Sequence, residues 1–168
     1  DSNAKGGHRL TVSNVTNAPI LDDVFDSRYG MTHKNEVTSE GQSLIVAWDI
    51  NDTWTFKSIT AHREGETTTA IDFDNLPAND LDVPAFYDDE QDTQEFQLSF
   101  NGERLQGVMG LYYYEGEASG AFDVVLTSAT LLTAGTVDTE SIAAYAHATY
   151  FVNDQWSLTV GGRYTQDK

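Results

Sequence analysis

Nine acidic side chains and no Lys or Arg lie within residues 72–95, "DFDNLPANDLDVPAFYDDEQDTQE". Clustered carboxylates suit Ca²⁺, which takes six to eight oxygen ligands. The spacing does not match the D-x-D-x-D-G calcium loop, and no Gly stands where that loop turns sharply. A solvated acidic loop, a divalent-ion site and a surface for a cationic or metal-loaded ligand are the three interpretations. The candidate residues are Asp88, Asp89, Glu90 and Asp92.

Two arginines are the main cationic candidates for ligand binding. Arg63 and Arg163 each stand opposite the apolar side chains of an alternating segment, so we expect both to point away from apolar surroundings. An arginine in such a place usually pairs with a carboxylate, and Glu95 or Asp49 could serve. Guiding an anionic substrate, or holding another part of the protein, is the second interpretation.

The remaining motifs do not support catalysis or a bound cofactor. Four histidines are scattered without i, i+4 spacing or its strand equivalent, so we expect no metal site built on them: His8, His33, His62 and His147. The sequence has no G-x-S-x-G, P-loop or H-E-x-x-H motif. It has no cysteine, which excludes a disulfide framework and a thiolate metal site. We therefore predict a protein that is not an enzyme and carries no cofactor.

The charge balance excludes a further class of partner. Acidic residues outnumber Lys and Arg by 27 to 9, which gives a formal net charge of −18. We expect no nucleic-acid partner, because the phosphates would be repelled rather than neutralised. Hydrophobic residues make up 39% of the chain, which is low for a buried core. No segment approaches the roughly 18 apolar residues of a membrane-spanning helix.

The elements that carry these residues follow a period of two rather than 3.6. In "TQEFQLSF" (93–100), apolar and polar side chains alternate, which indicates a strand with one apolar and one wet face. The segment "WSLTVGGRYT" (156–165) repeats the pattern and sets Val160 opposite Arg163. The sequence predicts six strands, near residues 42–50, 53–64, 93–101, 104–115, 141–152 and 155–165.

The predicted connections alternate between short and long. The short ones carry the Asn, Asp and Gly residues of tight hairpins: Asn51-Asp52, Asn101-Gly102-Glu103 and Asn153-Asp154. Residues 65–92 and 116–140 are predicted as long loops, and residues 1–40 as an irregular lead-in. All three prolines fall in these long segments, as expected for residues that cannot donate a ladder hydrogen bond: Pro19, Pro77 and Pro84.

The tryptophans mark one level of the predicted sheet. Trp48, Trp54 and Trp156 each lie within a few residues of a predicted tight turn. In a soluble sheet they would be core residues. In a membrane β-barrel, which has short turns on one side and long loops on the other, they would form an aromatic girdle at one membrane–water interface. We favour the barrel, because lipid then covers the apolar strand face.

Four segments, taken in order, resemble consecutive barrel strands of TonB-dependent outer-membrane receptors. They are "TFKSITAHREG" (55–65), "TQEFQLSF" (93–100), "LQGVMGLYYYEGE" (105–117) and "SIAAYAHATYFVNDQWSLTVGGRYTQDK" (141–168). The resemblance covers residues 41–168, whereas residues 1–40 are only loop-like and are expected to be extracellular. It implies an all-β fold, an antiparallel up-and-down meander of about six strands within a roughly 22-stranded transmembrane β-barrel.

The resemblance also implies location and partners. Such receptors lie in the Gram-negative outer membrane and take up a siderophore, vitamin or sugar with energy passed on by TonB through an N-terminal plug. Outer-membrane lipid, lipopolysaccharide, TonB and a small-molecule nutrient are the implied partners, and a divalent ion in the acidic segment could bridge to lipopolysaccharide phosphates. The chain shows no plug, TonB box, signal peptide or C-terminal aromatic strand. Six strands cannot close a barrel, so we interpret it as an internal barrel segment without a plug domain.

A second function class remains open from the sequence. The chain could be a soluble secreted acidic β-protein, such as an adhesin or a Ca²⁺-dependent carbohydrate-binding module. The position of the long connections and the level of the tryptophans favour the receptor segment over this alternative.

Overall fold

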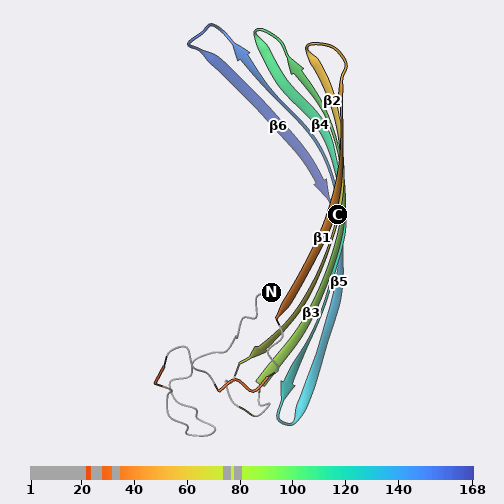
Figure 1. Ribbon diagram of the computed structural model, residues 1–168, viewed down its shortest axis with the longest axis vertical. Coiled ribbons are helices and arrows are strands. Elements are labelled where there is room, and N and C mark those ends of the chain that lie inside the picture. Colours follow the sequence, from red (N-terminus) through yellow and green to blue (C-terminus); the bar gives the residue numbers. More distant parts are fainter. Residues whose placement is uncertain (1–21, 24–27, 32–34, 74–76, 78–80) are drawn as a thin grey trace. The chain divides into compact units, whose positions relative to one another are not determined.

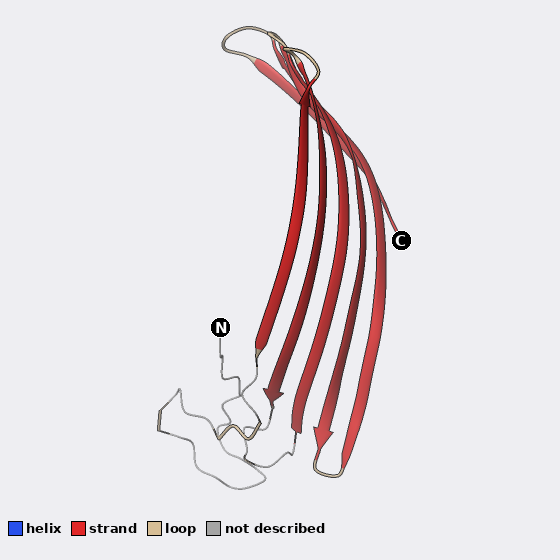
Figure 2. Ribbon diagram, turned by 45° about the vertical axis from the view of Figure 1, so that its right-hand side comes forward, coloured by secondary structure: helices blue, strands red, loops and turns tan. Residues whose placement is uncertain are grey.

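The computed structural model describes residues 22–23, 28–31, 35–73, 77 and 81–168. The regular structure in this part of the chain consists of β-strands (Figure 2). In chain order they are β1 (Glu36–Asp49), β2 (Trp54–Asp72), β3 (Leu81–Asn101), β4 (Leu105–Leu126), β5 (Ala129–Phe151) and β6 (Ser157–Asp167). No helix among the described residues is long and apolar enough to cross a membrane.

The strands form one six-stranded sheet in the order β1-β2-β3-β4-β5-β6 (Figure 1). Each strand is therefore hydrogen-bonded to its neighbour in the chain. The strands β5 and β6 pair antiparallel from Ser141 opposite Asp167 to Phe151 opposite Ser157. This confirms the predicted antiparallel meander of six strands, with β1 and β6 as its edges.

Three short turns connect β1 to β2, β3 to β4 and β5 to β6, at the predicted positions (Figure 1). The Asn51 Oδ1 atom accepts hydrogen bonds from the backbone N–H groups of Thr53 and Trp54, both at 3.0 Å. The Asn153 Oδ1 atom accepts from the N–H groups two and three residues further on, both at 2.9 Å. An asparagine side chain thus closes both turns by mimicking a backbone acceptor, which is why this residue type marks them in the sequence.

The chain divides into two compact units. Unit 1 comprises Asp1–Ser39, Gly65–Asp89 and Ala118–Thr136. Unit 2 comprises Glu40–Glu64, Glu90–Glu117 and Val137–Lys168. The three short turns belong to unit 2, and the connections from β2 to β3 and from β4 to β5 belong to unit 1.

The strands are longer than predicted, which corrects the long loops expected over residues 65–92 and 116–140. Only residues 73–80 separate β2 from β3, and Thr127-Ser128 alone separates β4 from β5. Glycines, a proline and acidic residues interrupt the apolar alternation in these segments, so the period-two signal is lost. β-Branched residues, such as the three threonines at 67–69, still favour extended backbone there.

Two further expectations need comment. Pro84 lies inside β3 rather than in a connection, so the prediction that every proline avoids the strands is wrong. It is the fourth residue of β3, at the end of the strand next to the β2–β3 connection. Pro19 and most of the lead-in, residues 1–40, lie outside the described residues. The described end of the lead-in already belongs to β1, which begins at Glu36.

The sheet has almost no conventional core. The buried hydrophobic side chains among the described residues are three alanines: Ala70, Ala85 and Ala143. In contrast, Val160 is 65% exposed and Tyr164 is 73% exposed. Water-soluble monomers rarely expose large contiguous apolar surfaces. The apolar side chains of this sheet therefore need a partner other than the described part of the chain.

Candidate functional site

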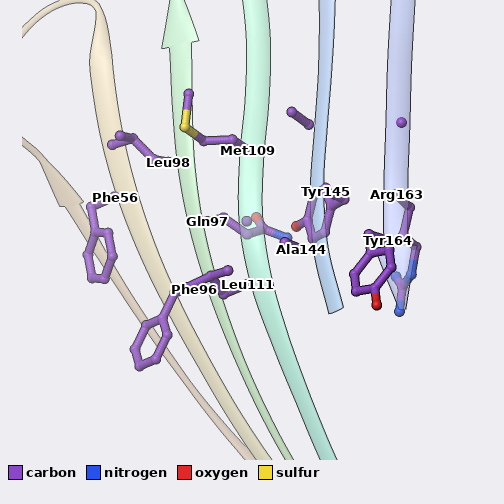
Figure 3. Close-up of a pocket in the computed structure, with 13 residues that line it drawn as sticks. Phe56, Phe96, Gln97, Leu98, Met109, Leu111, Ala144, Tyr145, Arg163 and Tyr164 are labelled. Atoms are coloured by element: carbon purple, nitrogen blue, oxygen red, sulfur yellow. The ribbon is translucent and has the colours of Figure 1, made fainter. Parts of the chain in front are cut away.

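One face of unit 2, called here the apolar face, carries the large hydrophobic side chains. Phe56 on β2 stacks on Phe96 on β3, with ring centroids 6.1 Å apart. The same shallow groove is lined by apolar side chains from β3 to β6: Leu98, Met109, Leu111, Ala144 and Tyr164 (Figure 3). Val160 and Phe100 line an adjoining groove with Trp54. The predicted sharing of one face by β3 and β6 is confirmed.

The opposite face of unit 2, called here the polar face, holds a hydrogen-bonded cluster. The Tyr145 hydroxyl on β5 donates to the Glu95 Oε1 atom on β3 at 2.5 Å. The Gln97 Nε2 group donates to the same oxygen at 3.0 Å. The bond between Tyr145 and Glu95 passes over β4 at Gly110, where an added Cβ would lie 2.6 Å from the tyrosine ring. A glycine is required there because the ring occupies the space of a side chain.

Arg163 also belongs to the polar face. Its register partner on β5 is Tyr145. The Arg163 Nε group donates to the Thr165 hydroxyl at 2.9 Å, and the guanidinium carbon lies 5.6 Å from the centroid of the Tyr112 ring. That distance is within the range of a cation–π interaction. Arg163 therefore lies opposite the apolar residues of β6, as predicted.

Arg63 contributes a second cation near the same tyrosine. Its Cγ atom lies against Gly41 of β1, where an added Cβ would be 3.1 Å away. Arg63 lines a small hollow with Gln91, Thr93 and Tyr112. The stem of the side chain thus packs on β1.

The two carboxylates that could have paired with these arginines have other partners in the structure. Among the described residues, neither Glu95 nor Asp49 forms an ion pair with Arg63 or Arg163. Glu95 accepts from Tyr145 instead, and Asp49 accepts from the Thr55 hydroxyl at 2.8 Å. Neutral donors on other strands reach these carboxylates, from β2 to Asp49 and from β5 across β4 to Glu95, which the sequence does not reveal.

The run of three tyrosines divides between the two faces. The Tyr113 hydroxyl donates to Glu115 Oε2, two residues further along β4, at 3.1 Å. Tyr112 lies under Arg163, and Tyr114 packs against the open position of Gly116. The prediction that Tyr113 opposes its two neighbours is confirmed.

The tryptophans flank the short turns of unit 2. Trp48 is the next-to-last residue of β1, and it is 63% exposed. Trp156 precedes β6 and is 70% exposed. Trp54 begins β2 and packs on Phe100, with ring centroids 4.8 Å apart. Their position beside the turns agrees with the sequence, and the girdle itself stays a prediction.

A third cluster joins a histidine to two carboxylates. The His62 Nδ1 atom lies 3.0 Å from Asp92 Oδ1 and 4.0 Å from Glu90 Oε1. One candidate ligand atom from each side chain falls within 4.8 Å of the others. His62 is on the same face of β2 as Phe56, because the two are an even number of residues apart. The residues that follow Phe56 on that face are polar, Ser58 and Thr60, so the cluster lies beyond the apolar part of the face.

The electrostatics of this cluster act on the histidine. The pKa of His62 is raised, chiefly because Asp92 accepts its hydrogen bond. The negative charges of Asp92, Glu90 and Glu64 add to this effect, and desolvation opposes it. Protonated His62 is therefore held by the carboxylates at a higher pH than a free imidazole.

Of the four acidic candidates from the sequence, two belong to the cluster around His62 and two do not. All four lie on β3 rather than in a loop. Glu90 and Asp92 join His62, which the sequence had not connected to them because it lies on another strand. Asp88 and Asp89 are outside this cluster, and Asp89 packs on Gly65 within unit 1.

Unit 1 contains two buried carboxyl groups that sequence reasoning missed. Asp72 is 0% exposed and Asp82 is 2% exposed. The Asp72 Oδ2 atom accepts a hydrogen bond from the Gly30 backbone N–H at 2.8 Å. Burial, followed by the charges of these two carboxyls, raises the pKa of Tyr29. Their place at the ends of β2 and β3 was hidden because the segment was predicted as a loop.

A sheet with one apolar face, one hydrogen-bonded polar face and short turns beside tryptophans has the features of a transmembrane β-barrel wall. A family model described as "TonB dependent receptor-like, beta-barrel" matches residues 2–168. The chain therefore belongs to the TonB-dependent receptor β-barrel family and is located in the Gram-negative outer membrane. This is a receptor and transporter family rather than an enzyme family. The soluble secreted alternative loses its support.

A solved structure is similar in fold. It is the ferric yersiniabactin uptake receptor FyuA from Yersinia pestis, with a TM-score of 0.69 and 20% sequence identity. The similarity covers 82% of this chain and 22% of that receptor. The chain thus spans about a fifth of the length of that protein. No curated protein matches the sequence.

Proposed function

We propose that this chain forms part of the wall of a TonB-dependent receptor that actively imports a scarce nutrient. A ferric siderophore is the first substrate class to test, and a vitamin or a sugar are the others. The opposed faces of unit 2 carry the proposal. An apolar face that the described residues leave uncovered, backed by a polar face of linked side chains, suits a wall between lipid and an aqueous lumen.

Each face then has a role in transport. The apolar face contacts outer-membrane lipid, and the three tryptophans form the girdle at one membrane interface. The polar face lines the lumen of a roughly 22-stranded barrel, where Arg63 and Arg163 meet an anionic ligand or the plug. TonB supplies energy through the plug. Asp88 and Asp89 bind lipopolysaccharide phosphates through a bridging divalent ion. No catalytic step is part of the function.

The siderophore class is supported by the fold and by charge. The solved receptor of similar fold takes up ferric yersiniabactin. Ferric siderophores that carry net negative charge would be attracted by the lumenal guanidinium groups, whereas the acidic part of β3 would repel them. Uptake is therefore expected to depend on the arginines of the polar face rather than on the acids.

Uptake measured in cells tests the proposal. A strain lacking the receptor is complemented with the full-length gene or with Arg163→Gln, and ⁵⁵Fe-siderophore uptake is followed with TonB present or absent. We expect TonB-dependent uptake from the wild type and several-fold slower uptake from Arg163→Gln at equal receptor abundance. Thr165→Val, which removes only the Arg163 hydrogen-bond acceptor, serves as the matched control. Uptake of iron, vitamin and sugar that is the same with and without the receptor contradicts the proposal.

A further inference from the structure

The cluster of His62, Glu90 and Asp92 offers a set of metal-ligand atoms that the import function does not use. His62 lies on β2, and the two acids lie two residues apart on β3, so they share one face of that strand. The Thr60 hydroxyl donates to Gln94 Oε1 at 2.6 Å. His62, two residues after Thr60 on β2, lies next to Asp92, two residues before Gln94 on β3. Cross-strand pairing therefore fixes the positions of these side chains.

The donor set selects a class of metal ion. One imidazole nitrogen with two carboxylate oxygens suits Zn²⁺ and related divalent transition metals, whereas Ca²⁺ takes oxygen ligands only. Around Zn²⁺, bound at about 2.1 Å, tetrahedral ligand atoms lie about 3.4 Å apart. The separations of 3.0 Å and 4.0 Å from His62 Nδ1 bracket that value. Exposed carboxylates close the remainder by small changes of rotamer.

We propose that His62, Glu90 and Asp92 form a binding site for a divalent transition metal ion of the Zn²⁺ type. Three protein ligands leave at least one coordination position open, which makes the site exchangeable rather than structural. The ion would also relieve the repulsion between Glu90, Asp92 and the nearby Glu64. The site does not depend on which nutrient the receptor imports.

The alternative is a plain ion pair between protonated His62 and its carboxylates. A proton and a metal ion compete for the same imidazole nitrogen, because metal binding requires the neutral ring. A hydrogen-bonded pair without metal affinity would show no saturable binding of Zn²⁺ that depends on the His62 imidazole. Titration with metal separates the two cases.

Calorimetric titration of the full-length receptor in detergent, stripped with a chelator and titrated with ZnCl₂ at pH 7.5, is the test. We expect saturable binding that His62→Gln and Asp92→Asn each weaken by at least about 10-fold. Substituting residues that only hydrogen-bond to metal ligands already lowers metal affinity by about 10–100-fold. His147→Gln removes an exposed histidine of β5, and Glu103→Gln removes an exposed turn carboxylate, as controls. Both controls should leave this site within about two-fold of wild type.

Several outcomes overturn the proposal. Equal Zn²⁺ binding by the wild type and His62→Gln excludes imidazole ligation at this site. An equal loss for Glu103→Gln assigns the binding to general negative charge. CaCl₂ binding that Asp92→Asn abolishes and His62→Gln leaves intact identifies an oxygen-only site, which is a different chemistry. Circular dichroism and heat-modifiable migration of each variant keep loss of metal distinct from loss of fold.

Discussion

The apolar and polar faces of unit 2 are built from alternate residues of the same strands, yet they are held in different ways. On the apolar face, side chains pack on one another and remain open outward, with Met109 50% and Leu111 57% exposed. On the polar face, side chains on neighbouring strands satisfy one another, as Thr149 and Thr159 do with hydroxyl oxygens 2.9 Å apart. One face thus depends on its surroundings, and the other depends on its own contacts.

This difference makes opposite predictions for adjacent residues. A substitution on the apolar face should affect folding according to the cost of exposing the new side chain to lipid. A substitution on the polar face should affect stability through a lost hydrogen-bond partner or through overpacking. The strand backbone is shared, so paired substitutions one residue apart separate these causes.

The largest effect is expected from a cation on the apolar face. Val160→Arg places a cation on the face that we propose contacts lipid, which costs about 2–4 kcal/mol near the bilayer midplane. Thr159→Arg, one residue earlier, puts the same group on the polar face and loses only the hydroxyl contact with Thr149. The fraction of full-length receptor that migrates in the folded, heat-modifiable form should fall sharply for Val160→Arg alone. Equal loss from both substitutions would mean that the faces are wrongly assigned.

A side chain on β4 under Tyr145 should have the next largest effect. The Cβ of Gly110→Ala would lie 2.6 Å from the tyrosine ring and 2.7 Å from the Phe96 carbonyl oxygen. Overpacking of this kind costs about 1–3 kcal/mol. Gly162→Ala is the control, because nothing lies within 4 Å of its added Cβ. Urea unfolding in lipid vesicles should show a lower midpoint for Gly110→Ala only. An unchanged midpoint would show that the ring moves aside freely.

The strands that the sequence predicts are those in which an apolar face and a polar face alternate. The six strands of unit 2 are predictable because one face is apolar and the other polar, so their side chains alternate. The asparagines at 51 and 153 mark the turns because their side chains accept two N–H groups each. The parts of β2 to β5 that lie in unit 1 are predicted as loops because glycines, Pro84 and acidic residues interrupt the alternation there.

The candidate site divides similarly. The face on which Arg63 and Arg163 lie could be inferred from period two, but their partners could not, since these come from strands that only the register brings together. His62 stands 28 residues before Glu90 in the sequence, and no local spacing signals that the two meet on adjacent strands. The buried Asp72 and Asp82 were missed with the strands that carry them.

A smaller effect is expected from the bond that links β3 to β5. Tyr145→Phe removes the hydroxyl that donates to Glu95, and Glu95→Gln removes the acceptor charge. The pair lies on a partly exposed face, so we expect a coupling of about 1 kcal/mol in a double-mutant cycle. Gln97 donates to the same oxygen and keeps Glu95 hydrogen-bonded in the tyrosine variant. Strictly additive effects on the unfolding free energy would contradict a direct bond.

The smallest effect concerns Arg163 and the ring of Tyr112. The guanidinium carbon lies 5.6 Å from the ring centroid at an exposed position, where such an interaction contributes about 0.5 kcal/mol. Tyr112→Leu should lower the unfolding free energy by this extra amount in the wild type and not in an Arg163→Met background. Arg163→Lys keeps the charge but loses the planar group and the Nε–H donated to Thr165, so it should fall between wild type and Arg163→Met. If Tyr112→Leu has the same effect in both backgrounds, the ring packs beside the arginine without holding it, and the guanidinium remains available to a ligand.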